Sequence, residues 1–151
     1  METNKQVVLN VLKGAFIERD ATVVDRYFSP DYVQHNPVIP NGAKAIANLI
    51  PTLKDLSYEI GMVVTEGDLV MVHGRYVGWG PKPLVAVDIF KVKDGKVVEH
   101  WDVMQEEVPA SATASGKRQS VPHGEGRALD GFDLDRQPYK QGRAVELPLH
   151  V

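Results

Sequence analysis

The 151-residue sequence contains no cysteine. Disulfide frameworks, thiolate zinc sites and cysteine nucleophiles are therefore excluded. No apolar run approaches the roughly 20 residues of a membrane-spanning helix, and no glycine-rich phosphate-binding loop occurs. The net charge of −3 offers no excess of positive charge to a nucleic-acid backbone. We therefore expect a small acidic cytoplasmic protein that binds neither nucleic acid nor a membrane.

What the sequence does contain divides near Pro109. Residues 1–108 carry clear hydrophobic patterns, whereas residues 109–151 are rich in glycine and proline and follow no sustained period. A segment of that composition does not fold alone. We expect residues 1–108 to form one domain, and residues 109–151 to be an extension that is loosely ordered or packed on the body or on a partner subunit.

The patterns predict helices first and strands afterwards. Apolar residues at spacings of three and four predict a helix over about residues 4–19, and a second short helix ends before Pro30. Residues 31–37 are interpreted as a connecting segment, and a third helix follows Gly42 with an interruption at Pro51. Alternation predicts four strands, at residues 58–65, 69–77, 84–92 and 96–107. Because no helix separates these strands, we expect an α+β fold in which one curved antiparallel sheet wraps over helices.

The hairpin between the last two strands decides which residues face each other. A two-residue turn pairs Asp88 with Trp101, whereas a three-residue loop with a bulge pairs Asp88 with His100. We favour the bulged loop because it sorts the side chains of both strands into two sets. One face collects Asp88, Phe90, His100, Asp102 and Met104, and the other collects Val85, Val87, Ile89, Trp101 and Val103. Register is set by this kind of sorting whenever one face is buried.

The three polar residues carry the functional hypothesis. Asp88 lies in a stretch whose other residues are apolar, as in a buried strand. Burial of a carboxyl group favours its protonated form. Two carboxylates and an imidazole that face one enclosed space suit general acid–base chemistry, with Asp102, Asp88 and His100 as the candidate catalytic residues. The alternatives are that Asp88 and His100 form a buried structural pair, or that they face solvent on an open sheet.

Further residues are candidates for the border and lining of such a pocket. Each polar one also has a structural interpretation, as a turn-fixing or surface-paired side chain. No His-x-His or His-Glu-x-x-His spacing occurs, so we predict no metal and no other cofactor. The candidate substrate-binding residues are His35, Asn36, His73, Arg75, Trp79, Phe90 and Met104.

The opposite face of the predicted sheet is also apolar and includes Trp101. A sheet that is apolar on both faces needs cover on both sides, and the helices cover only one of them. We expect a homodimer formed through this outer face. The alternative is that the extension after Pro109 covers it.

Two segments resemble the SnoaL-like polyketide cyclases of the nuclear transport factor 2-like superfamily, namely residues 31–37 and residues 88–102 with their His-x-Asp ending. That superfamily also contains ketosteroid isomerase, scytalone dehydratase and limonene epoxide hydrolase. The resemblance covers about residues 4–108. It implies a cone-shaped α+β barrel with helices packed in a strongly curved sheet, a deep pocket, and dimers formed through the outer face. It also implies that Asp102 acts as acid or base in an intramolecular aldol closure without metal or cofactor, with His100 at the position of the family's histidine.

The sequence differs from the cyclases at Asp88, where they carry a histidine. Limonene epoxide hydrolase instead has two aspartates with an arginine between them. That arginine corresponds to a position near Ala86, so the arrangement is incomplete unless Arg75 substitutes for it.

We therefore expect an enzyme of the cyclase or isomerase type that acts on a small, largely apolar carbonyl compound. In this hypothesis Asp102 moves the proton, neutral Asp88 hydrogen-bonds the oxyanion, and His100 orients Asp102. The alternatives are water activation toward an epoxide in the same pocket, and a dimer that binds a small molecule without catalysis.

Overall fold

The computed structural model describes residues 1–120, and the remainder of the predicted extension lies outside the described residues. Helices and strands follow the predicted order, with one additional strand. The helices are α1 (Asn4–Leu12), continued by a π-helical segment (Lys13–Glu18), α2 (Thr22–Tyr27) and α3 (Ala43–Leu49), followed by a 3-10 turn (Ile50–Thr52). The strands are β1 (Phe28–Gln34), β2 (Ser57–Glu66), β3 (Leu69–Val77), β4 (Leu84–Lys93) and β5 (Lys96–Glu106), and a short 3-10 turn (Ala110–Ala112) follows them.

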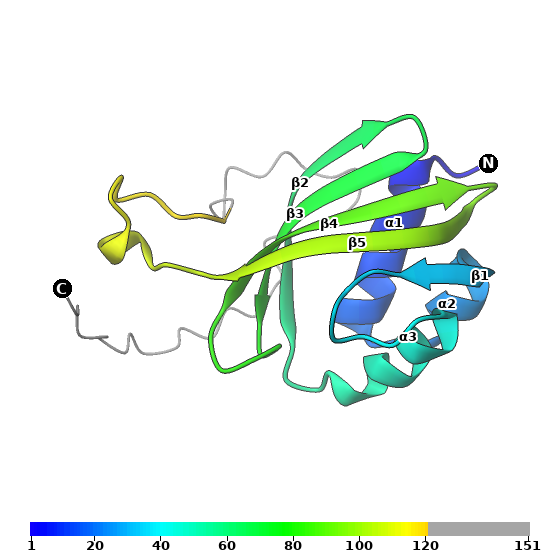
Figure 1. Ribbon diagram of the computed structural model, residues 1–151, viewed down its shortest axis with the longest axis horizontal. Helices are drawn as coiled ribbons and strands as arrows, with labels where there is room; N and C mark the ends of the chain where they lie inside the picture. Colours follow the sequence, from blue (N-terminus) through cyan, green and yellow to red (C-terminus); the bar gives the residue numbers. More distant parts are fainter. Residues whose placement is uncertain (121–151) are drawn as a thin grey trace.

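The five strands form one curved sheet in the order β1-β5-β4-β3-β2, and the helices lie against one of its faces (Figure 1). Strands β2 to β5 form the predicted antiparallel meander. This arrangement confirms the α+β fold, in which three helices pack on a strongly curved sheet.

Strand β1 was missed by the sequence interpretation, which ended a helix before Pro30 and treated residues 31–37 as a connection. The segment instead pairs in parallel with β5, so the sheet is mixed. Its burial alternates, with Tyr32 and Gln34 buried and Val33 exposed between them. A single strand at the sheet edge tolerates Pro30, because proline lacks only the donor that an edge strand leaves unpaired.

Helix α1 provides the apolar layer beneath the sheet. Thr3 caps it by accepting a hydrogen bond from the Gln6 amide, and its buried residues pack against those of the inner face of β3 and β4. Gly14 lets α2 approach closely, because a Cβ atom at this position would collide with Val23. Pro51 ends the third helix as predicted. Within residues 1–120, no helix has the length and apolar character needed to cross a membrane.

The hairpin between β4 and β5 combines a two-residue turn with a bulge. Asp94 and Gly95 both have positive φ angles, 52° and 73°, as a tight turn with the twist of a hairpin requires. Lys93 pairs with Lys96, so the predicted three-residue loop is wrong. Two pairs further along, the register shifts by one residue, because β5 contains the extra residue Val98.

The bulge restores the predicted sorting of side chains although the predicted partners are wrong. Asp88 pairs with Asp102 and not with His100, and Phe90 pairs with His100. Asp88, His100 and Asp102 nevertheless share the helix-facing side of the sheet, because the shift relative to the prediction is two residues. Trp101 lies on the outer face, as predicted.

The outer face of the sheet carries exposed apolar side chains. Met62, Val64 and Val103 are 60%, 61% and 70% exposed. The end of this face near Glu107 is partly covered by the start of the extension, since the Ser120 hydroxyl donates a hydrogen bond of 3.3 Å to the Glu107 carboxylate. The described part of the extension therefore contacts the body at its edge and leaves these three side chains accessible.

Candidate active site

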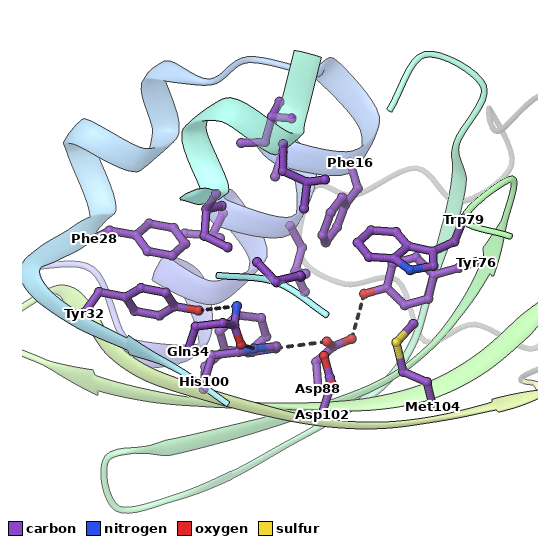
Figure 2. A pocket seen from close by; sticks show the side chains of 18 residues that line it. Phe16, Phe28, Tyr32, Gln34, Tyr76, Trp79, Asp88, His100, Asp102 and Met104 are labelled. Atoms are coloured by element: carbon purple, nitrogen blue, oxygen red, sulfur yellow. Dashed lines mark hydrogen bonds and ion pairs between the residues drawn. The ribbon is translucent and has the colours of Figure 1, made fainter. Parts of the chain in front are cut away.

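A pocket lies between the helices and the inner face of the sheet (Figure 2). It contains about 570 Å³ of space outside the protein atoms, part of which is open to solvent. Within residues 1–120, its lining is mostly apolar and includes no lysine or arginine. Apart from the indole N–H of Trp79, the hydrogen-bonding side chains of the lining come from the sheet, and they are Tyr32, Gln34, Tyr76, Asp88, His100 and Asp102.

Asp88 lies near the centre of the sheet, because β4 is flanked by β3 and β5. The residue is only 4% exposed. Its Oδ1 atom lies 3.0 Å from Nε2 of His100, and its Oδ2 atom accepts a hydrogen bond of 2.8 Å from the Tyr76 hydroxyl (Figure 2). Both carboxylate oxygens therefore have a polar partner, as burial of such a group requires.

Gln34 contacts the other nitrogen of the imidazole. Its Oε1 atom lies 2.9 Å from Nδ1 of His100, and its side-chain nitrogen donates a hydrogen bond of 2.9 Å to the Tyr32 hydroxyl. A continuous chain of hydrogen bonds therefore runs from Tyr32 through Gln34, His100 and Asp88 to Tyr76 (Figure 2). The predicted contact of His100 with Asp102 is not formed, because both ring nitrogens have other partners.

Asp102 is only partly buried and borders the pocket beside this chain. Its Oδ2 atom accepts a hydrogen bond of 2.6 Å from the side-chain nitrogen of Asn36. The Oδ1 atom of Asn36 in turn accepts a hydrogen bond of 2.9 Å from the Val38 amide. Asn36 therefore holds Asp102 in place, and its own amide group is occupied by these two contacts and does not line the pocket.

The buried tyrosines are held in their neutral form. Burial, followed by the negative charges of Asp102 and Asp88, raises the pKa of Tyr32 well above its usual range. Burial, followed by the charge of Asp88, also raises the pKa of Tyr58 and of Tyr76. These hydroxyl groups therefore serve as hydrogen-bond partners and not as bases.

The structure brings together six of the ten predicted site residues at the pocket. Asp88, His100 and Asp102 converge on its polar side, where one ligand atom of each lies within 4.8 Å of the others. The predicted apolar lining residues Trp79, Phe90 and Met104 all line it.

The four remaining residues do not line the pocket. His35 follows Gln34, and its ring stacks on outer-face Trp101 with ring centroids 4.9 Å apart. His73 and Arg75 alternate with the inward residues of β3 and lie on the outer face. These positions correct the expectation that they border the pocket.

Arg75 has a clear role elsewhere. Its guanidinium forms an ion pair of 2.7 Å with Glu107, and both side chains are almost buried. Because the sheet separates this pair from Asp88 and Asp102, Arg75 does not supply the arginine of an Asp-Arg-Asp arrangement.

Gln34, Tyr32 and Tyr76 are site residues that the sequence interpretation missed. Tyr76 sits at an inward position of the predicted strand at 69–77, so its alternation could have placed it in the pocket. The signal for Tyr32 and Gln34 was their two-residue spacing with Asn36, which is the period of a strand.

The side chains of Asp88, His100 and Asp102 could together hold one divalent cation. Their candidate ligand atoms lie within 4.8 Å of one another. Carboxylate oxygens and an imidazole nitrogen suit a transition-metal ion. Experiments on this site therefore need a chelator control.

A family model described as the SnoaL-like domain matches residues 8–100. Among curated proteins, none matches the sequence. Four solved structures illustrate the similarity at low identity. TsrD from Streptomyces laurentii is 24% identical with a TM-score of 0.55, over 67% of this chain and 87% of that one. A candidate polyketide cyclase from Bacillus cereus is 18% identical with a TM-score of 0.58, over 68% and 74%.

The third is an LEH-like epoxide hydrolase from M. tuberculosis, which is 20% identical with a TM-score of 0.55, over 68% of this chain and 82% of that one. An NTF-2 like protein from Burkholderia xenovorans has a TM-score of 0.61 at 15% identity and covers 79% of this chain and 95% of its own. Similarity at these identities shows the fold that the chains share.

Proposed function

Because this chain belongs to the SnoaL-like domain family, we propose that it is a cofactor-independent acid–base enzyme of the aldol cyclase or isomerase type. Its substrate is a small, largely apolar compound with a carbonyl group. The observation that carries the proposal is the position of Asp102. Its carboxylate borders an apolar pocket, is oriented by Asn36, and lies beside a buried pair that contains a proton donor.

In the proposed reaction, Asp102 removes a proton from the carbon next to the substrate carbonyl. The electron pair of that C–H bond forms the enolate, and its negative charge develops beside the Asp88–His100 pair. In an isomerase, the proton returns from Asp102 to another carbon. In a cyclase, the enolate carbon attacks a second carbonyl of the same molecule, and the resulting alkoxide takes up the proton that Asp102 removed. An apolar lining strengthens each of these contacts because it excludes water.

Deuterium exchange tests this proposal. A panel of small cyclic and linear ketones is incubated in heavy water with chelator-treated wild-type protein, Asp102→Asn, and Asp31→Asn as a control for the loss of an exposed aspartate. We expect exchange at carbon with the wild type and the control, and a fall of about 100-fold or more with Asp102→Asn. Equal exchange by all three proteins contradicts the assignment of Asp102.

Water activation toward an epoxide is the second candidate. It is favoured by the direct pairing of Asp88 with Asp102, which places two carboxyl groups at one site, and by the similarity to an epoxide hydrolase structure. Incubation of epoxides in ¹⁸O-labelled water distinguishes it, because a hydrolase incorporates the label into a diol. A pocket that binds panel members but catalyses neither reaction indicates a binding protein.

We also propose that two copies associate through the outer face of the sheet. Met62, Val64 and Val103 are apolar and exposed there, and the described part of the extension does not cover them. Burial of such a patch between identical copies removes apolar surface from water, which favours association.

A further inference from the structure

We propose that Gln34 is a positioning residue that fixes the tautomer of His100, so that His100 and Asp88 share a single proton beside Asp102. This inference deepens the proposed function by describing the same site. The tautomer follows from the hydrogen bonds and does not depend on the proposed reaction.

The first step is the orientation of the Gln34 side chain. The oxygen and nitrogen of an amide side chain look alike, and only their partners distinguish them. Here the backbone N–H of Asn36 settles the question, because this group only donates and it lies 3.0 Å from Oε1 of Gln34. Gln34 therefore presents its oxygen to Asn36 and its nitrogen to the Tyr32 hydroxyl, 2.9 Å away.

The second step is the tautomer of His100. The same Oε1 atom lies 2.9 Å from Nδ1 of the imidazole. An amide oxygen only accepts, so Nδ1 must carry the hydrogen. The second ring nitrogen, Nε2, then faces Oδ1 of Asp88 at 3.0 Å.

The third step places one proton between His100 and Asp88. A neutral ring with hydrogen on Nδ1 has a lone pair on Nε2, which would repel a bare carboxylate oxygen at this distance. A single proton therefore bridges the two atoms, as an imidazolium that donates to a carboxylate or as a carboxyl group that donates to a neutral ring. In both forms the pair has no net charge.

The fourth step concerns the other oxygen of Asp88. Oδ2 accepts from the Tyr76 hydroxyl, and the raised pKa of Tyr76, caused first by burial and then by the charge of Asp88, keeps that hydroxyl protonated. One oxygen of Asp88 therefore takes part in the shared proton with His100, and the other is occupied by the Tyr76 hydroxyl.

Backbone pairing makes this arrangement rigid. Gln34 and His100 are direct partners across the parallel pairing of β1 with β5, and the His35 amide donates to the His100 carbonyl at 3.0 Å. Gln34 is 9% exposed and His100 is 6% exposed, so water does not compete for these contacts.

The test reads the tautomer directly by long-range ¹H–¹⁵N NMR on histidine-labelled, chelator-treated protein. We expect Nδ1 of His100 to carry hydrogen in the wild type. Gln34→Leu removes the acceptor and should abolish this preference, whereas Gln6→Leu, which removes a half-buried glutamine of α1 outside the site, should not. If Gln34→Leu fails to fold, Tyr32→Phe is the second variant. It keeps the aromatic ring at position 32 but removes the hydroxyl that accepts from the Gln34 amide, so the ring-nitrogen signals of His100 should broaden or shift.

Two results would overturn the inference: hydrogen on Nε2 with a bare Nδ1 in the wild type, or an unchanged His100 spectrum in Gln34→Leu. Absence of carbon exchange would refute the proposed function alone, because the NMR experiment needs no turnover.

Discussion

Asp88 and Asp102 are direct cross-strand partners on β4 and β5, yet their carboxyl groups contact different partners. Asp88 contacts an imidazole and a tyrosine hydroxyl. Asp102 accepts from the amide of Asn36. Two identical side chains at one level of the sheet are thereby placed in different environments, as a site that used one carboxyl group as acid and the other as base would require.

Replacement of Asn36 should impair Asp102 indirectly. Asn36→Ala removes the hydrogen bond of 2.6 Å that orients the carboxylate, so we expect the exchange rate to fall about 10-fold to 100-fold with little change in KM. The matched control is the neighbouring substitution His35→Gln, whose side chain lies on the other face of the sheet. If Asn36→Ala and His35→Gln lose activity to the same extent, the loss comes from a disturbance of this segment and not from the broken contact with Asp102.

Replacement of Tyr76 by phenylalanine should reduce stability. It leaves Oδ2 of Asp88 without its partner in a buried position, and such a loss costs about 1–3 kcal/mol of the free energy of unfolding. Urea denaturation measures this change. Tyr27→Phe removes a more accessible hydroxyl, which accepts a hydrogen bond from Asn10, and serves as the control with a smaller expected effect. A Tyr76→Phe protein as stable as the wild type would argue against that bond.

Arg75→Met should separate stability from catalysis. Removing one partner of the nearly buried pair with Glu107 should cost on the order of 3 kcal/mol. Because Arg75 lies on the outer face, the activity of the folded fraction should not change with either ketones or epoxides. Specific loss of epoxide hydrolysis would instead assign Arg75 to that reaction.

The proposed dimer is tested by a charge on its contact surface. Val103 is 70% exposed on the outer face, and Val103→Glu should halve the mass measured by light scattering, because a buried unpaired carboxylate opposes association. Val38→Glu introduces the same charge at a side chain that is 75% exposed in the loop after β1, and should leave the mass unchanged. A wild-type protein with the mass of one chain refutes the proposal.

Alkaline pH should unfold the protein through its buried tyrosines. The pKa values of Tyr32, Tyr58 and Tyr76 are raised in the folded chain, first by burial. The folded state therefore keeps protons that the unfolded state releases above a pH of about 10. Stability is fully present below that pH and falls above it, by about 1.4 kcal/mol per pH unit for each of these groups. Their tyrosinate absorbance should appear together with unfolding. Its appearance in the folded protein would contradict the burial effect.

Much of this architecture could be predicted from local pattern. The alternation along β3 and β4 indicated the strands and their inner faces, and Asp88 stood out as a charge within an apolar stretch. The contacts of Asp88 could not be read in the same way. They depend on β1, whose pairing with β5 joins residues more than sixty positions apart, and proline and exposed residues within β1 weakened its strand pattern.

The hairpin shows a second limit of local reasoning. Asp94-Gly95 is a strong signal for a two-residue turn, and the structure contains that turn. The sorting of side chains pointed to a different pairing, since a plain two-residue turn would direct Trp101 inward. Both signals were valid, and the bulge at Val98 reconciles them. No residue type at position 98 marks a bulge, so the sequence alone could not reveal it.

The bulge at Val98 also makes the spacing of β5 part of the chemistry. Val97 and His100 are both buried although they are three residues apart, which a regular strand does not allow. Deletion of Val98 would restore a regular strand, and every side chain after it would turn to the opposite side of the sheet. His100 and Asp102 would then point outward and Trp101 would fill the cavity. A chain with every candidate site residue still present would lose its site, so the number of residues in β5 matters to the pocket as much as their identity.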